Sequence, residues 1–134
     1  MATDERTARD LSQASMAAIE ARDREAWLAL FEDDAVMEDP IGPSLFDPEG
    51  TGHRGIDAIA AFCDTVIATS EAIRFEVCQS FLCGDEVANV GMIRITFAGG
   101  SAVEVDGVYT YRRSSQGKLA ALRAYWNPDA IRAV

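Results

Sequence analysis

Asp39 is the residue of this sequence best placed for proton-transfer chemistry. It follows the short run Ala35–Glu38, which has the character of a strand, and it precedes Pro40 and a long loop. Pro40 has no N–H, so one donor that could stabilise the carboxylate is missing. An apolar environment would raise the pKa of this carboxyl group toward the range of a general base. The alternative is that Asp-Pro only starts a turn.

Metal and nucleophile chemistry find little support in the sequence. His53 is the only histidine and lies in a Gly-rich loop, so it cannot form a multi-His site, and we expect it at the surface. The three cysteines (Cys63, Cys78 and Cys83) lack metal-site spacing, and their odd number argues against a disulfide framework. We expect reduced, buried thiols. No Ser/His/Asp pattern or Gly-rich phosphate loop occurs, and we expect no metal and no cofactor.

The composition indicates one globular domain, spanning residues 1–134. Hydrophobic residues make up 49% of the chain and charged residues 25%. The net charge of −10 would repel nucleic acids and anionic membranes, although it leaves room for a small neutral ligand. No apolar run approaches the length of about 20 residues that a membrane span needs, and Met1–Arg9 is too polar for a secretory signal. We therefore expect a cytoplasmic protein.

Three helices are predicted around the Asp39 segment. Apolar residues recur at helical spacing over residues 4–22, and a short second helix follows with Asp23 as its N-cap. The acidic stretch Glu32–Asp34 should end that helix, because carboxylates are unfavourable at a helix C-terminus. A third helix is predicted over residues 56–69. Between Asp39 and this helix, residues 41–55 are rich in Gly, Pro and Asp and should form a loop at the rim of a pocket.

From residue 72 onward, the apolar period changes from 3.6 to 2. Ile73, Phe75 and Val77 alternate with charged residues, and similar patterns continue through residues 93–97, 102–113 and 119–126. Tight turns between these segments predict sequential hairpins. The expected fold is therefore α+β: three N-terminal helices packed in a curved, mostly antiparallel sheet, which encloses an apolar pocket at its open end.

The segment Phe31–Gly42, which reads Phe-Glu-Asp-Asp-Ala-Val-Met-Glu-Asp-Pro-Ile-Gly, resembles the ketosteroid isomerases (steroid delta-isomerases). These belong to the superfamily with a nuclear-transport-factor-2-like (NTF2-like) fold, which includes SnoaL-like polyketide cyclases and limonene-epoxide hydrolase. The resemblance extends over nearly the whole chain, including Gly52–Gly55 and Leu122–Asn127. It implies the NTF2-like cone, and it implies that Asp39 is the general base.

The same resemblance implies an oxyanion hole made of a tyrosine on the first helix and a protonated aspartic acid on a late strand. Ser15 stands where the tyrosine is expected, so this half of the machinery departs from the family. Asp106 is the candidate for the acid. Strict alternation places Asp106 on the opposite face from Tyr109 and Tyr111, unless a bulge at Gly107 realigns it. The alternative is that Gly107 occupies the position of the acid and Asp106 is a surface charge.

Further donors and walls of the pocket come from aromatic residues. Tyr109, Tyr111 and Trp126 could each donate a hydrogen bond from an apolar wall, and Trp126 matches an aromatic pocket position of the family. Each could equally serve in packing. Phe62 fits a core position by its helical spacing, as Trp27 does, and we also count Phe62 among the ligand-contacting candidates together with Ser15.

Three functions remain open. The first is isomerisation of a hydrophobic unsaturated ketone, such as a steroid, with Asp39 as the base. The second is binding of a lipophilic ligand without chemistry. The third is another reaction on the same scaffold, such as polyketide cyclisation or epoxide hydrolysis, for which Arg94 and Arg123 are available. Apolar residues on the outer face of the late strands also predict a two-fold homodimer.

Overall fold

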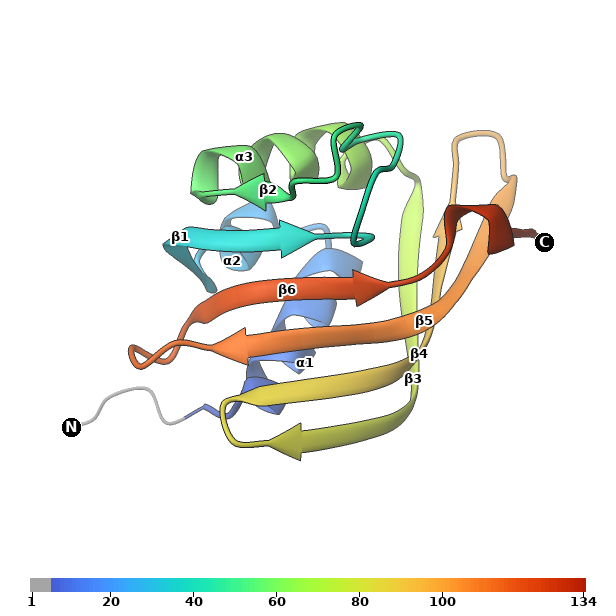
Figure 1. Cartoon of the computed structure of the whole chain (residues 1–134). Coiled ribbons are helices and arrows are strands. Elements are labelled where there is room, and N and C mark those ends of the chain that lie inside the picture. Colours follow the sequence, from blue (N-terminus) through green and yellow to red (C-terminus); the bar gives the residue numbers. More distant parts are fainter. Residues whose placement is uncertain (1–5) are drawn as a thin grey trace.

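A seven-stranded sheet organises the chain in the computed structural model of the protein, which describes residues 6–134 (Figure 1). The strands are β1 (Phe31–Glu38), β2 (His53–Arg54), β3 (Ala72–Cys83), β4 (Glu86–Thr96), β5 (Ala102–Arg113), β6 (Leu119–Tyr125) and β7 (Arg132–Ala133). Their order is β2-β1-β6-β5-β4-β3, with β7 beside β5. Among the described strands, only β1 and β6 pair in parallel. The predicted α+β class with a mostly antiparallel sheet is confirmed.

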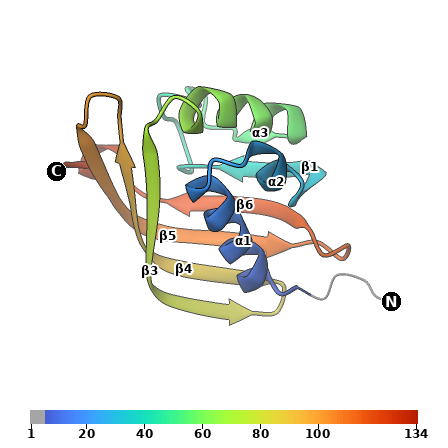
Figure 2. The same ribbon diagram turned by 180° about the vertical axis from the view of Figure 1, so that it is seen from behind.

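The helices lie on one side of this sheet. They are α1 (Ala8–Glu20), α2 (Arg24–Leu28) and α3 (Ile56–Phe62), which continues into the π-helical segment Cys63–Ile67. Helix α1 crosses the inner faces of β3, β4 and β5, and α3 packs against β1 (Figure 2). Thr7 caps α1 through a capping box with Asp10, and Asp23 caps α2 as predicted. The expected start of the first helix, residues 4 and 5, lies outside the described residues.

The sheet bends around these helices at a pair of facing glycines. Gly91 on β4 pairs with Gly107 on β5. A Cβ atom on Gly91 would lie 2.0 Å from the carbonyl oxygen of Glu76, and one on Gly107 would lie 2.5 Å from the carbonyl oxygen of Tyr125. Only glycine permits such a close backbone approach. A bulge between Val77 and Gln79 adds to the bend, which hollows the inner face of the sheet.

The core fills the space between the helices and the narrow end of this hollow. Its most buried large side chains are Leu11, Phe31, Met37, Ile59 and Leu119. A polar connection fixes α1 on the sheet: the Asn89 amide donates to the Ser12 hydroxyl at 3.1 Å and accepts from the Ser80 hydroxyl at 2.7 Å. The wide end of the hollow, which the core leaves unfilled, is where the candidate site lies.

Two elements differ from the sequence-based expectation. Strand β1 begins at Phe31, four residues earlier than predicted, so Glu32–Asp34 belongs to the strand and does not end a helix. Asp33 and Asp34 point to solvent there, and this orientation lets an acidic segment join the sheet. The predicted third helix at 56–69 is shorter as an α-helix, because its second half has π-helical hydrogen bonding.

Candidate active site

Two adjoining hollows occupy the wide end of the sheet. The larger, here called the outer chamber, has a volume of about 350 Å³, and the smaller, the deep chamber, has a volume of about 80 Å³. The larger volume is in the range of small-molecule sites. Five residues contribute to the walls of both chambers: Asp39, Phe62, Val66, Ile93 and Ile95. Among the described residues that line either chamber, Asp39 alone carries a charge.

Asp39 lies directly after the end of β1, at the junction of the two chambers. Its Oδ1 atom accepts a hydrogen bond of 2.7 Å from Nε1 of Trp126. Burial among apolar walls raises the pKa of Asp39, whereas the Trp126 hydrogen bond and the charge of His53 partly oppose this rise. A carboxylate with a raised pKa and one oxygen not used by Trp126 is suited to general-base chemistry.

His53 is not the surface residue that the sequence predicted. It is half-buried on β2, and its ring lies 4.9 Å from that of Phe62. Its charge acts on Asp39 and lowers the pKa of that carboxyl group. His53 lies there because β2 pairs with β1. Its partner in this pairing is Met37, which stands two positions before Asp39 in the sequence. Sequence reasoning missed this neighbour because a two-residue strand inside a Gly-rich loop has no periodic signal.

Trp126 follows β6 and covers the inner side of the sheet at Gly107. A Cβ atom on Gly107 would lie 3.1 Å from Cβ of Trp126, so the indole occupies the space beside this glycine. The structure places Trp126 in the wall of the outer chamber, as expected for a pocket residue. Its N–H is donated to Asp39, however, and is not directed at a ligand. Among the candidate donors, Trp126 therefore donates to Asp39 within the protein.

Tyr109 and Tyr111 both line the deep chamber. The Tyr109 hydroxyl donates to the carbonyl oxygen of Val105 at 3.0 Å. Burial raises the pKa of both tyrosines, and the charge of Asp39 raises both further, so both phenols are protonated at neutral pH. Ser15 lies beside Tyr111 within hydrogen-bonding reach, which partly opposes the rise in the pKa of Tyr111.

Ser15 is also buried in the wall of the deep chamber. Its hydroxyl oxygen accepts a hydrogen bond of 2.9 Å from Nε1 of Trp27. Trp27 belongs to α2 and packs edge-to-face on Phe31, with ring centroids 4.9 Å apart. Sequence reasoning assigned Trp27 to the core and missed its link to the site. The site thus joins side chains of α1, α2 and β5 with two residues, Asp39 and Trp126, that directly follow β1 and β6.

Asp106 does not join this site, so its assignment as a catalytic acid is corrected. Strand β5 pairs with β4 without a shift through Gly107, so no bulge realigns it. The Asp106 side chain is 62% exposed and forms an ion pair with Arg132. Gly107 takes the inner position in its place. Phe62, by contrast, is buried in the wall of both chambers, where it serves the core and the pocket together.

Two arginines considered for epoxide chemistry also lie away from Asp39. Arg94 bonds Glu104 at 3.3 Å, and Arg123 bonds Glu38 at 2.8 Å. Both arginine side chains are about half exposed, at 47% and 45% respectively. Neither arginine can therefore join Asp39 in a group of one arginine and two carboxylates that activates water. Across residues 6–134, no group of three or more His, Cys, Asp or Glu side chains could hold a metal ion.

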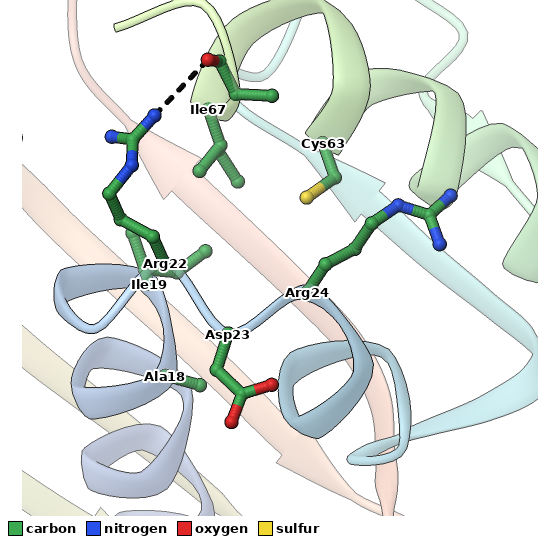
Figure 3. A pocket seen from close by; sticks show the side chains of 8 residues that line it. Ala18, Ile19, Arg22, Asp23, Arg24, Cys63 and Ile67 are labelled. Atoms are coloured by element: carbon green, nitrogen blue, oxygen red, sulfur yellow. Dashed lines mark hydrogen bonds between the residues drawn. The ribbon is translucent and has the colours of Figure 1, made fainter. Parts of the chain in front are cut away.

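A separate hollow of about 100 Å³ lies between α1, α2 and the helical segment that follows α3 (Figure 3). Its charged residues have partners: Arg22 donates to the carbonyl oxygen of Ala68, and Arg24 pairs with Asp64. Cys63 faces this hollow, and burial raises the pKa of its thiol. We interpret this hollow as a seam between helices.

The prediction of buried thiols is correct for Cys63 and wrong for the other two cysteines. Cys78 and Cys83 are exposed, and all three are free. Cys78 lies at the bulge of β3, and Cys83 lies at the end of that strand. The general tendency of free cysteines to be buried does not reveal that these two positions are exposed.

A family model described as a SnoaL-like domain matches residues 12–122. The chain belongs to the SnoaL-like domain family. Members of this family have the NTF2-like fold, and the large curved sheet with few helices agrees with that fold. No curated protein matched the sequence. Within residues 6–134, no helix is both long and apolar enough to span a membrane.

Solved structures extend this assignment of the SnoaL-like chain. RV0760c from Mycobacterium tuberculosis is 39% identical, with a TM-score of 0.91 and full coverage of both chains. The same protein in complex with estradiol-17β-hemisuccinate gives 41% identity, a TM-score of 0.87, and coverage of 92% of this chain and 96% of that one. Delta 5-3-ketosteroid isomerase from Mycobacterium sp. is 40% identical, with a TM-score of 0.90 and coverage of 95% and 98%. These similarities confirm the resemblance to ketosteroid isomerases.

A more distant likeness shows the fold alone. The epoxide hydrolase/cyclase-like enzyme SalBIII, described in pyran ring formation in polyether salinomycin, is 17% identical. Its TM-score is 0.79, with coverage of 94% of this chain and 95% of that one. The scaffold therefore accommodates different chemistries, and the reaction must be argued from the residues of this site.

Proposed function

We propose that this SnoaL-like protein is an isomerase that moves a proton within a hydrophobic unsaturated ketone, with Asp39 as the base. The observation that carries the proposal is the position of Asp39, whose pKa is raised by burial and which is the one charged residue among the described residues that line the two apolar chambers. The 40% identity to a ketosteroid isomerase supports the same reaction. The bound steroid in the RV0760c complex supports a hydrophobic ligand of that shape.

The proposed reaction begins with the Asp39 carboxylate accepting a proton from the carbon between the ketone and the alkene. The electron pair of the broken C–H bond moves toward the carbonyl oxygen and forms a dienolate. Asp39 then returns the proton to the far carbon of the conjugated system, and the double bond comes into conjugation with the ketone. The Trp126 hydrogen bond holds one carboxylate oxygen, so the other oxygen carries the proton in both steps.

A direct assay tests this reaction. The wild-type protein and Asp39→Asn are mixed with a β,γ-unsaturated ketosteroid, and the absorbance of the conjugated enone is followed. Turnover by the wild type that Asp39→Asn abolishes supports the proposal. Turnover that is equal in both proteins would remove Asp39 from its role as the base.

A second candidate function is ligand binding without chemistry. It is favoured by one observation: Ser15 stands where the resemblance to ketosteroid isomerases places a tyrosine of the oxyanion hole. RV0760c, solved with an estradiol conjugate, shows that a similar chain holds a steroid. Tight steroid binding by the wild type and by Asp39→Asn, with turnover by neither, would establish this function in place of the first.

We also propose that two copies associate through the outer face of the sheet. Phe81, Ala88, Val90, Met92 and Val108 point outward on β3, β4 and β5, and Phe81 is 54% exposed. Toward one end of this face, Glu104 and Asp106 already form ion pairs with Arg94 and Arg132. A two-fold axis through the middle of the face would bring the apolar residues of both copies together.

A further inference from the structure

Most hydrogen-bond donors around the two chambers already have acceptors within the protein. In the deep chamber, Trp27 donates to Ser15 and Tyr109 donates to the carbonyl oxygen of Val105. In the wall of the outer chamber, Trp126 donates to Asp39. Each of these three protons is therefore committed within the protein. The hydroxyl groups of Ser15 and Tyr111 are the remaining pair in the wall of the deep chamber.

The hydroxyl groups of Ser15 and Tyr111 carry two protons, and one of them is left for a ligand. The oxygen of Ser15 already accepts the indole N–H of Trp27, and Ser15 and Tyr111 lie within hydrogen-bonding reach of each other. Two hydroxyl groups that share one hydrogen bond use one proton between them. Among the described residues, no hydrogen bond takes up the second proton, although the Asp39 carboxylate oxygen that Trp126 leaves free also lines the chamber. A phenol is a stronger acid than an alcohol, so the arrangement in which Ser15 donates and Tyr111 keeps the free proton provides the better donor to an enolate.

We propose that Tyr111 donates its hydroxyl proton to the carbonyl oxygen of the ligand, with Ser15 and Trp27 as the residues that position it. This inference rests on the proposed isomerase function and adds the group that faces the developing negative charge. Ser15 thus contributes to the oxyanion site indirectly, through a tyrosine of β5, although no tyrosine stands at its own position.

Strand β5 explains why the donor lies so deep. Gly107, Tyr109 and Tyr111 share the inner face of β5. The space beside Gly107 is closed by Trp126 and by the backbone of Tyr125, so no donor can stand there. The next inner residue, Tyr109, has its hydroxyl bound to Val105. Tyr111 is the first inner residue of the strand beyond Gly107 whose hydroxyl reaches the deep chamber without a backbone acceptor.

The two chambers then fix the orientation of the ligand. The deep chamber, at about 80 Å³, admits only a small carbonyl-bearing end, whereas the outer chamber, at about 350 Å³, holds the larger body. Asp39 lies at their junction, beside the carbons next to the carbonyl group. The far end of the ligand leaves between Leu45, Phe97 and Ile131, which are exposed apolar residues of the outer chamber. The ligand class is an elongated, flat hydrophobic ketone with its carbonyl group at one end.

The negative charge that forms during the proposed reaction is accounted for at each step. The electron pair released when Asp39 takes the proton accumulates on the carbonyl oxygen, and the Tyr111 hydroxyl strengthens its hydrogen bond to that oxygen without transferring its proton. The pair returns to carbon when Asp39 gives the proton back. Removing one such donor from an enzyme typically lowers kcat by about 10²–10³-fold.

The experiment compares Tyr111→Phe with Tyr125→Phe, whose phenol lies on the outer face of the sheet. Each protein binds a conjugated ketosteroid, and the infrared carbonyl stretch of the bound steroid is recorded alongside kcat for the β,γ-unsaturated substrate. We expect Tyr111→Phe to raise the stretching frequency toward its value in an apolar solvent and to lower kcat by about 10²–10³-fold. Tyr125→Phe should change neither. Ser15→Ala should give an intermediate frequency, because Tyr111 then loses the partner that positions it.

The possible results distinguish the assignment of Tyr111 as the donor from the proposed isomerase function. A folded Tyr111→Phe protein that binds the steroid with an unchanged stretching frequency overturns the assignment of Tyr111, even where turnover still depends on Asp39. A wild-type protein whose bound steroid has the Tyr111-dependent frequency but does not isomerise the substrate leaves the contact in place and removes the isomerase function. If Tyr111→Phe does not fold, an unchanged frequency in Ser15→Ala overturns the arrangement. Failure of the wild type to bind the steroid overturns both proposals.

Discussion

Trp126 and Asp39 are joined by one hydrogen bond of 2.7 Å, although they lie 87 residues apart in the chain. The parallel pairing of β1 and β6 accounts for this contact. Parallel strands end at the same edge of a sheet, so the residues that follow Glu38 and Tyr125 meet there. The hydrogen bond opposes the rise in the pKa of Asp39 that burial causes. Trp126 therefore lowers the pKa of Asp39, the proposed base.

Replacing Trp126 by Phe should move the acid limb of the pH–rate profile to higher pH. The indole N–H stabilises the ionised carboxylate, so its removal raises the pKa of Asp39 further. The reaction needs ionised Asp39, and a higher pKa therefore lowers kcat/KM at acidic pH and leaves it least affected at alkaline pH. The measurement is kcat/KM for a β,γ-unsaturated ketosteroid across pH. Tyr125→Phe serves as the control, because its phenol lies on the outer face of the sheet, away from Asp39. An acid limb that stays in place, or moves to lower pH, contradicts this role of Trp126.

Asp39 should also reduce the stability of the fold at neutral pH. Its pKa in the folded protein is raised above the ordinary value of 3.8, so between these two values the folded state binds more protons than the unfolded state. Stability then falls as pH rises through this window, and the loss is complete above the raised pKa and absent below 3.8. We expect Asp39→Asn to have a higher free energy of unfolding than the wild type at pH 7.

Urea denaturation of both proteins at several pH values checks this expectation. The difference between Asp39→Asn and the wild type should shrink as pH falls toward 3.8. A wild type whose stability relative to Asp39→Asn rises with pH, so that the variant is the less stable protein at pH 7, would show that the carboxylate is stabilised by its surroundings.

Most of the fold could be predicted because its signals are local. The caps at Asp23 and the alternation in β3 to β6 depend on neighbouring residues only, and both are confirmed. Strand β1 was placed too short because its charged first half, Glu32–Asp34, is stabilised by pairing with β6, which is distant in sequence. Likewise, β7 has two residues, and its pairing with β5 leaves no periodic pattern to detect.

The site was predictable to the extent that single strands determine it. Asp39 was found through its position before Pro40 and through the family resemblance, and strict alternation placed Tyr109 and Tyr111 on one face of β5. The Asp106 question depended on whether a bulge existed at Gly107, and a bulge depends on the partner strand. The contacts of Trp27 with Ser15 and of Trp126 with Asp39 join distant elements, so no local pattern could reveal them.

Gly107→Ala should disturb both the sheet and the base. The new methyl group would lie 2.5 Å from the carbonyl oxygen of Tyr125 and 3.1 Å from Cβ of Trp126, so the end of β6 must shift. We expect a loss of about 1–3 kcal/mol in the free energy of unfolding. The displaced Trp126 should also weaken its bond to Asp39, and the acid limb of the pH–rate profile should again move to higher pH.

Asp106→Asn is the matched control for Gly107→Ala, since it changes the neighbouring residue on the outer face. Exposed ion pairs such as Asp106–Arg132 contribute little to stability, and neither the free energy of unfolding nor kcat should change appreciably. Urea denaturation and the enone assay provide both measurements. A Gly107→Ala protein as stable and active as Asp106→Asn would contradict the close packing of β6 and Trp126 on this glycine.

The proposed dimer can be tested by placing a charge at the centre of the outer face. Val90 pairs with Val108 there, and a two-fold axis through this region would place the valines of both copies in the interface. Val90→Asp would then bury unpaired carboxylates, which is strongly unfavourable, and should convert a dimer into a monomer. Light scattering during size-exclusion chromatography measures the mass. Leu45→Asp, at a residue that is 83% exposed at the chamber rim, should leave the mass of the wild type unchanged. A monomeric wild-type protein, or a Val90→Asp protein that remains dimeric, contradicts an interface on this face.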